Sequence, residues 1–172
     1  MRRRVLLVTP RFPFPAVSGG EKWMSELAKS LSREHEVSLF SFLRPADETV
    51  QTALAMRLEG TLFKRVFLLP KPEPPAGNPL GLPLLPASFW SPEAAKELEA
   101  AAGETAAEIV HINFAEMASY VPPLPAGAAS VYTEHDSSYL YPWKYYLRET
   151  AGLKGFLRVG EFVVPAQDRH HR

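Results

Sequence analysis

VLLVTPRFPFPAVSGGEKWMSELAKSLSREHEVSLFSFL, residues 5–43, contains two candidate strands with a candidate helix between them. Val5 to Thr9 is a short apolar run, typical of a strand that is covered on both faces in a parallel sheet. Val37 to Leu43 is a β-branched and aromatic run that also predicts a strand. A strand, a helix and a strand in this order form one βαβ unit.

The helix between these strands is predicted from its first turn and from its apolar stripe. Ser18 and Glu21 have the spacing of a capping box, in which each side chain binds a backbone N–H of the other residue. Four apolar residues then recur at helical spacing and predict the buried face. They are Met24, Leu27, Ala28 and Leu31.

The same alternation continues along the chain. The expected elements are a helix capped by Asp47 that carries Val50, Leu54 and Leu58, a strand at 62–69, a helix capped by Ser91 to about 107, a strand at 108–114, a short helix at 115–121 and a strand at 129–136. Alternating strands and helices predict an α/β fold, a Rossmann-like, doubly wound and mainly parallel sheet. With the strand order 3-2-1-4-5, ligands would bind between the carboxyl ends of the first and fourth strands.

Domain organisation is predicted from composition. Residues 70–92 hold eight of the seventeen prolines, which cannot continue a helix or donate to a sheet. We interpret this segment as a long loop over the sheet, with a domain linker as the alternative. Residues 1–140 are expected to form the Rossmann-like domain, and residues 141–172 an aromatic and basic C-terminal segment.

Composition narrows the class of protein. The 172 residues include 19 basic and 19 acidic side chains, so no overall charge favours nucleic acid or an anionic membrane. The absence of cysteine excludes disulfides and thiolate chemistry, and it suits a cytoplasmic location. No apolar run approaches the ~18 residues of a membrane span. Peripheral attachment to the inner membrane face and self-association stay open.

Gly19 and Gly20 mark a candidate anion site. They lie where the first strand turns into the first helix, so backbone N–H groups and the positive helix end could face a phosphate. The segment matches neither the Walker loop nor the dinucleotide fingerprint. The alternative is a turn that needs glycine for a positive φ angle.

His135 stands at the end of the expected fifth strand, at the edge where ligands would bind, and is the candidate catalytic residue, with a structural role as the alternative. His111 on the fourth strand is interpreted as structural. A metal site built from these histidines and the neighbouring acids is disfavoured, because no helical ligand pair is present.

An aromatic and basic segment follows His135. Its rings could stack on sugars or pack at an interface, and they are Tyr139, Tyr141, Trp143, Tyr145 and Tyr146. Its cations could bind phosphate, although a solvated surface is favoured, and they are Lys144, Arg148, Lys154 and Arg158.

Four features follow one another along the chain: a short strand, PRFPFPAVSGGEKWMSELAKSL, EIVHINF and SVYTEHD. In this order they resemble the N-terminal half of a family 4 (group 1) glycosyltransferase of the GT-B type. The resemblance covers roughly residues 4–140. It implies an acceptor-side domain of a retaining enzyme that uses a nucleotide-diphosphate sugar and needs no metal or other cofactor. Gly19 and Gly20 would lie against the donor diphosphate, and His135 would contact the transferred sugar or its leaving phosphate. Asn113, Asp136 and Tyr139 are candidate contacts to the acceptor or sugar.

The family's second, donor-binding domain is not found in these residues. The sequence therefore predicts a domain that needs a C-terminal domain or a partner chain, and that has little activity alone. A non-catalytic Rossmann-like binding module is the alternative from another class. The sugar acceptor, whether a glycan, a lipid or a small molecule, has no pattern that identifies it.

Overall fold

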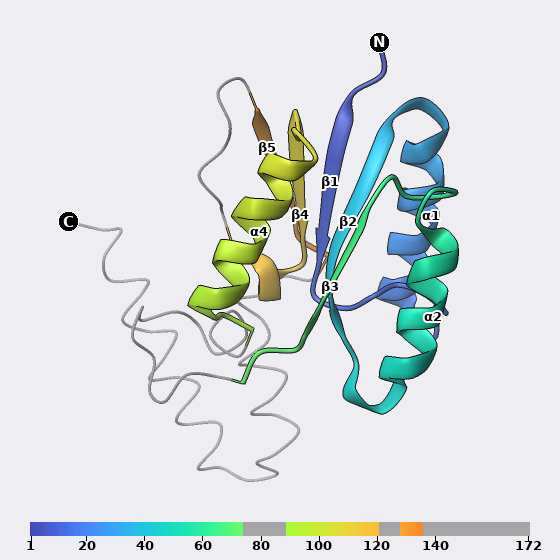
Figure 1. Ribbon diagram of the computed structural model, residues 1–172, viewed down its shortest axis with the longest axis vertical. Coiled ribbons are helices and arrows are strands. Elements are labelled where there is room, and N and C mark those ends of the chain that lie inside the picture. The colour runs from blue at the N-terminus through green and yellow to red at the C-terminus, as the bar shows by residue number, and fades with distance from the viewer. Residues whose placement is uncertain (74–88, 121–127, 136–172) are drawn as a thin grey trace, which may run out of the picture. The chain divides into compact units, whose positions relative to one another are not determined.

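A five-stranded parallel sheet forms the centre of the fold (Figure 1). The computed structural model describes residues 1–73, 89–120 and 128–135, all within one compact unit, Met1–His135. Its strands are β1 (Arg4–Thr9), β2 (Glu36–Leu43), β3 (Val66–Pro70), β4 (Ile109–Asn113) and β5 (Ala129–Thr133). They pair in the order β3-β2-β1-β4-β5, and every pair is parallel. The α/β class, the doubly wound topology and the predicted strand order are confirmed.

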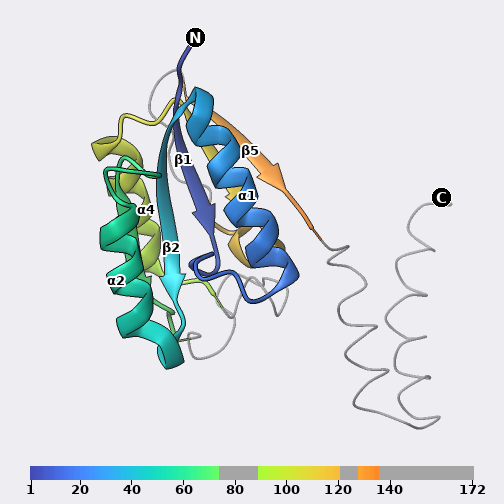
Figure 2. The ribbon, with the colours of Figure 1, turned by 90° about the vertical axis from the view of Figure 1, so that its right-hand side faces the viewer.

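Helices cover both faces of this sheet. Helices α1 (Gly19–Glu34) and α2 (Glu48–Leu58) lie on one face, and α4 (Pro92–Glu104) lies on the other (Figures 1 and 2). Alternate residues of β1 separate accordingly: Leu7 joins the core under α1 and α2, whereas Leu6 joins the core under α4. Because β1 is covered on both sides, its sequence is a continuous apolar run rather than an alternating one.

The first turn of α1 has the predicted capping box. The Glu21 N–H donates to the Ser18 hydroxyl at 3.2 Å, and Glu21 Oε2 accepts from the Ser18 N–H at 2.9 Å. The same oxygen accepts from the Val17 N–H at 2.8 Å, and Glu21 Oε1 pairs with the Arg44 guanidinium at 3.1 Å. The buried Glu21 carboxylate therefore ties the start of α1 both to the preceding loop and to the residue that follows β2.

The loop between β1 and α1 is held in place by its aromatic residues. Phe12 is fully buried, and its N–H donates to the Phe42 carbonyl at 3.0 Å. The Phe14 ring lies between those of Phe12 and Phe63, with centroid distances of 5.8 and 6.1 Å. This packing anchors the loop on the α1 and α2 side of the sheet.

The prediction is wrong about the start of one strand and about the cap of one helix. The strand expected at 62–69 is Val66–Pro70, because the N–H groups of Leu62 and Phe63 both turn back to the Leu58 carbonyl at 3.0 Å. Asp47 precedes α2 but makes no capping hydrogen bond; its carboxylate lies 3.3 Å from Arg44 Nε, outside hydrogen-bond geometry.

The buried face of α2 and the ends of four other elements also differ. Val50 is 55% exposed, since α2 turns Gln51 and Ala55 toward the core instead. Helix α4 starts at the Ser91 cap and Pro92 as expected but ends at Glu104, where Ala106 takes a φ of 45°. A left-handed residue of this kind cannot continue a helix. The short helix expected at 115–121 is a single 3₁₀ turn, Ala115–Met117, and β4 and β5 are shorter than expected.

We expect Ser18→Ala to lower the free energy of unfolding by about 1 kcal/mol, because it removes the N-cap oxygen of α1. Ser32→Ala is the matched control. Ser32 lies in the same helix, and its hydroxyl only donates to the Lys29 carbonyl. Urea unfolding of both variants measures the difference. Equal stabilities of the two variants would contradict the assigned role of the capping box.

Candidate functional site

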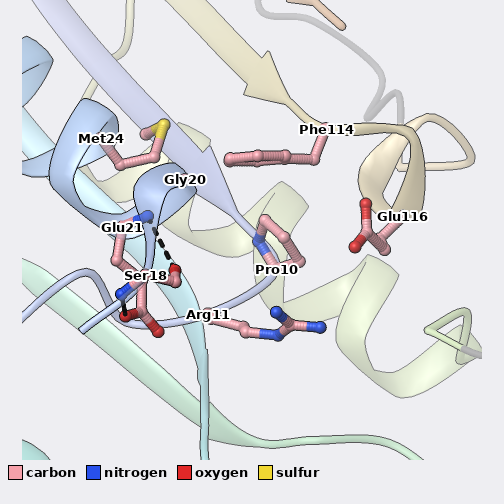
Figure 3. A pocket seen from close by; sticks show the side chains of 8 residues that line it. All are labelled: Pro10, Arg11, Ser18, Gly20, Glu21, Met24, Phe114 and Glu116. Carbon is pink, nitrogen blue, oxygen red and sulfur yellow. Dashed lines mark hydrogen bonds between the residues drawn. The ribbon is translucent and has the colours of Figure 1, made fainter. Parts of the chain in front are cut away.

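A small pocket opens at the carboxyl ends of β1 and β4, where the segments that follow the two strands diverge (Figure 3). The chain leaves β1 through the loop to α1 on one face, and it leaves β4 through the 3₁₀ turn toward the edge strand β5. The pocket has a volume of about 50 Å³, and its lining residues are Pro10, Arg11, Ser18, Gly20, Glu21, Met24, Phe114 and Glu116. This is the position at which doubly wound α/β proteins bind ligands.

Gly19 and Gly20 occupy the first turn of α1, beside this pocket. Neither has a positive φ angle, so the alternative that they serve a left-handed turn is wrong. Among the described residues, neither of their N–H groups donates a hydrogen bond. Two backbone donors at the positive end of a helix are therefore available to an anion.

The two glycines differ in what surrounds them. A Cβ atom built on Gly20 would lie 3.2 Å from two carbons of the Phe114 ring, whereas one built on Gly19 would meet nothing within 4 Å among the described residues. Close packing against Phe114 accounts for the glycine at position 20. Neither backbone conformation nor packing in the described part of the chain accounts for the exposed Gly19.

Phe114 follows the last residue of β4 and has an unusual backbone conformation, with φ of 71° and ψ of 149°. Only glycine adopts this region readily, and such a conformation costs about 1–3 kcal/mol. It is fixed by two hydrogen bonds. The Phe114 N–H donates to the Thr133 carbonyl at 2.9 Å, and its carbonyl accepts from the Met117 N–H at 3.0 Å.

His135 lies between two aromatic rings. Its imidazole centroid is 4.1 Å from that of Phe114, at an interplanar angle of 34°, and 4.1 Å from that of Trp23, at 69°. Phe114 comes from the end of β4 and Trp23 from the second turn of α1. Gly20 of the predicted glycine pair and the predicted histidine thus both lie against the ring of Phe114.

His111 is half-buried on β4, and its Nε2 lies 2.9 Å from the Thr133 hydroxyl. Burial lowers the pKa of His111, and the charge of the nearby His135 lowers it further. The imidazole therefore favours the neutral form near pH 7. Its interaction with Thr133 joins β4 to β5, in agreement with the structural interpretation.

Charged side chains of both signs surround the pocket. Arg11 is exposed, forms no ion pair with any described residue, and extends across the lower side of the pocket in Figure 3. Glu116 enters from the 3₁₀ turn on the other side. The third charge, Glu21, is neutralised by its ion pair with Arg44. Within residues 1–73, 89–120 and 128–135, no group of three metal-ligating side chains is found.

The remaining candidate contacts lie away from the pocket or outside the described residues. Asn113 is fully buried, and its amide nitrogen is 3.0 Å from the His111 carbonyl and 3.5 Å from that of Val8. It joins β4 to β1, and its contact to an acceptor stays a prediction. Asp136 and Tyr139 lie outside the described residues, as do residues 74–88 of the proline-rich segment and the aromatic and basic segment after Tyr139.

Sequence reasoning missed Phe114, Trp23 and Arg11. The sequence predicts Phe114 as the last residue of a strand, and only its place at the carboxyl end of that strand points to the ligand-binding edge. Trp23 precedes the apolar stripe of α1 and is 41% exposed, which is unusual for such a large ring. No pattern in the sequence distinguishes Arg11 from other surface cations.

The lowered pKa of His111 gives a pH-dependent stability. The unfolded chain binds the proton at a higher pH than the folded chain, so the free energy of unfolding should fall as pH is lowered below about 6.5. His111→Gln, whose amide can still reach Thr133, should remove this part of the slope. Urea titrations of both chains between pH 5 and 7.5 test it. A slope that is unchanged in the variant would show that other groups cause it.

Comparison of the chain with known proteins adds no relative from which a role could be transferred. No protein-family model, no curated protein and no solved structure matches the chain. None of the helices in the described part of the chain is long and apolar enough to cross a membrane. The function is therefore argued from the residues around the pocket.

Proposed function

We propose that this chain is the acceptor-side domain of a retaining glycosyltransferase that transfers a sugar from a nucleotide-diphosphate sugar. One observation carries the proposal. Gly20 and His135, which the sequence resemblance assigns to the same donor, contact the same aromatic ring, that of Phe114, at the ligand-binding edge of the sheet. The two residues are far apart in the sequence, and a shared ligand would explain why both belong to one site.

The chemistry of the first turn of α1 suits a departing diphosphate. Negative charge builds up on the diphosphate as the bond to the sugar breaks. Preoriented N–H donors at a helix N-terminus stabilise such charge without reorganising. In this proposal Gly19 and Gly20 supply the donors, and the missing side chain at position 19 allows the phosphate oxygens to approach.

The charges near the pocket are compatible with an anionic ligand. Glu21 would repel a diphosphate if it were free, but its carboxylate is bound by two backbone N–H groups and by Arg44. Arg11 has no ionic partner among the described residues and could turn toward a phosphate. Its exposed charge would add attraction that weakens with salt.

His135 would hold the transferred sugar or the leaving phosphate by a hydrogen bond from its imidazole. The rings of Phe114 and Trp23 restrict the orientation of that imidazole. A fixed donor loses less entropy on binding than a mobile one. The pocket, about 50 Å³, holds only a part of a nucleotide sugar, and the resemblance implies that a second domain forms the opposite wall. The chain alone should therefore bind weakly and turn over little.

Binding can be tested on the ¹⁵N-labelled chain by NMR titration with pyrophosphate and with a nucleoside diphosphate. We expect dissociation constants in the millimolar range and the largest amide shifts at Gly19 and Gly20. The free nucleoside is the control and should leave these amides unchanged. Saturating diphosphate without shifts at either glycine would refute the diphosphate site.

Gly19→Asp separates ligand binding from structure. The open space at position 19 accepts the side chain, and a carboxylate at a helix N-terminus should stabilise α1. The same charge should weaken diphosphate binding by about fivefold, equivalent to ~1 kcal/mol of repulsion across a few ångströms of water-like dielectric. Gly19→Ala is the neutral control. Unaltered affinity in the aspartate variant would place the ligand elsewhere.

Catalysis is tested with the chain joined to, or mixed with, a donor-binding domain of a GT-B glycosyltransferase. Sugar transfer should then be lost in His135→Ala while the folded fraction is unchanged. His35→Ala is the matched control, since His35 follows α1 at the opposite edge of the sheet. Full activity of the His135 variant would exclude its catalytic role, and a complex without transfer to any acceptor would favour the non-catalytic binding module.

A further inference from the structure

We propose that Phe114 is a positioning residue that sets the orientation of His135 and the approach of the first turn of α1 at the same time. The inference deepens the proposed function, on which its catalytic consequence rests. Its structural part concerns only three groups of this chain: the Phe114 ring, the His135 imidazole and the Gly20 backbone. It can therefore be measured without any ligand.

The Phe114 ring lies against two groups, the Gly20 backbone and the His135 imidazole. Two of its outer carbons, Cε1 and Cζ, face Gly20 so closely that a Cβ atom there would lie only 3.2 Å away. The His135 imidazole also packs against the ring, with 4.1 Å between centroids. In Figure 3 the ring extends from the end of β4 toward α1, above Pro10 and Arg11. A shift of the ring would therefore be felt by both Gly20 and His135.

The backbone makes this placement specific. Residue 114 has a φ of 71°, a conformation in which glycine would be least strained, yet the position carries a phenylalanine. Its N–H and carbonyl are both held, by Thr133 and Met117. Because the backbone is held at both groups, the direction of the Cα–Cβ bond is defined, and packing against Gly20 and His135 then orients the ring. Strain of this kind persists only where the surrounding structure enforces it.

Trp23 completes the arrangement around the imidazole. Its ring meets that of His135 edge-on, at an interplanar angle of 69°, whereas the Phe114 ring is tilted by 34°. The imidazole is thus bounded by one ring from β4 and one from α1. Removal of the Phe114 ring would leave one side of His135 without this boundary.

The test follows the imidazole Cε1–H resonance of His135, assigned with His135→Asn. An aromatic ring at this distance shifts that resonance, so Phe114→Leu should move it markedly while the resonance of His35 stays in place. Trp23→Leu shows the effect of removing the other ring. An unchanged His135 resonance in a folded Phe114→Leu chain would overturn the proposal.

A matched glycine pair tests the same coupling with Phe114 intact. Gly20→Ala should push the Phe114 ring and move the His135 resonance, whereas Gly19→Ala, which meets no described neighbour, should not. If Gly20→Ala and Gly19→Ala move the His135 resonance equally, the proposal is overturned. This comparison does not depend on whether Phe114→Leu folds.

Transfer activity supplies the second readout, in the chain combined with the same donor-binding domain. Phe114→Leu should lower kcat by about tenfold or more, because small misplacements of a reacting group are costly. If the wild type neither binds diphosphate nor transfers sugar, the proposed function fails while the effects on His135 still support the positioning role. Full kcat together with a moved His135 resonance would overturn the catalytic consequence.

Discussion

The buried carboxylate of Glu21 connects the parts of the molecule on which the site depends. One oxygen binds the N–H groups of Val17 and Ser18, and the other pairs with Arg44. A carboxylate with these partners fixes where α1 begins relative to the end of β2. Because Gly19 and Gly20 directly precede it, their free N–H groups inherit the same fixed position. The acidic residue thus fixes the backbone of the candidate anion site while its own charge is neutralised.

The overall fold could be predicted because its signals are local and repeated. Continuous apolar runs identified β1 and β2, and the capping residues Ser18 and Ser91 identified the starts of α1 and α4. The error at Asp47 has a local cause. The 3₁₀ turn Pro45–Asp47 runs directly into α2, so Asp47 has a φ of −126° and a ψ of 16° instead of the extended conformation that is typical of an N-cap residue.

The candidate site was predictable only in part. Position in the topology identified the loop that contains Gly19 and Gly20 and the strand end that precedes His135. It could not identify Phe114, because the importance of this ring comes from a positive φ angle and from contacts to residues far away in the sequence. Such a conformation is imposed by the folded structure and opposes the local preference of phenylalanine. Arg11 differs from the other surface cations only by its place beside the pocket, which the sequence does not reveal.

The contact between Gly20 and Phe114 also limits how this sequence can change over time. A side chain at position 20 would need the space that the ring occupies, so glycine is required there only as long as the ring stays, and the ring keeps its place only as long as the glycine does. Substitutions at the two positions should therefore be interdependent, each altering the cost of the other. In a set of related sequences, a larger residue at position 20 should accompany a smaller one at position 114. The open position 19 should vary independently of both.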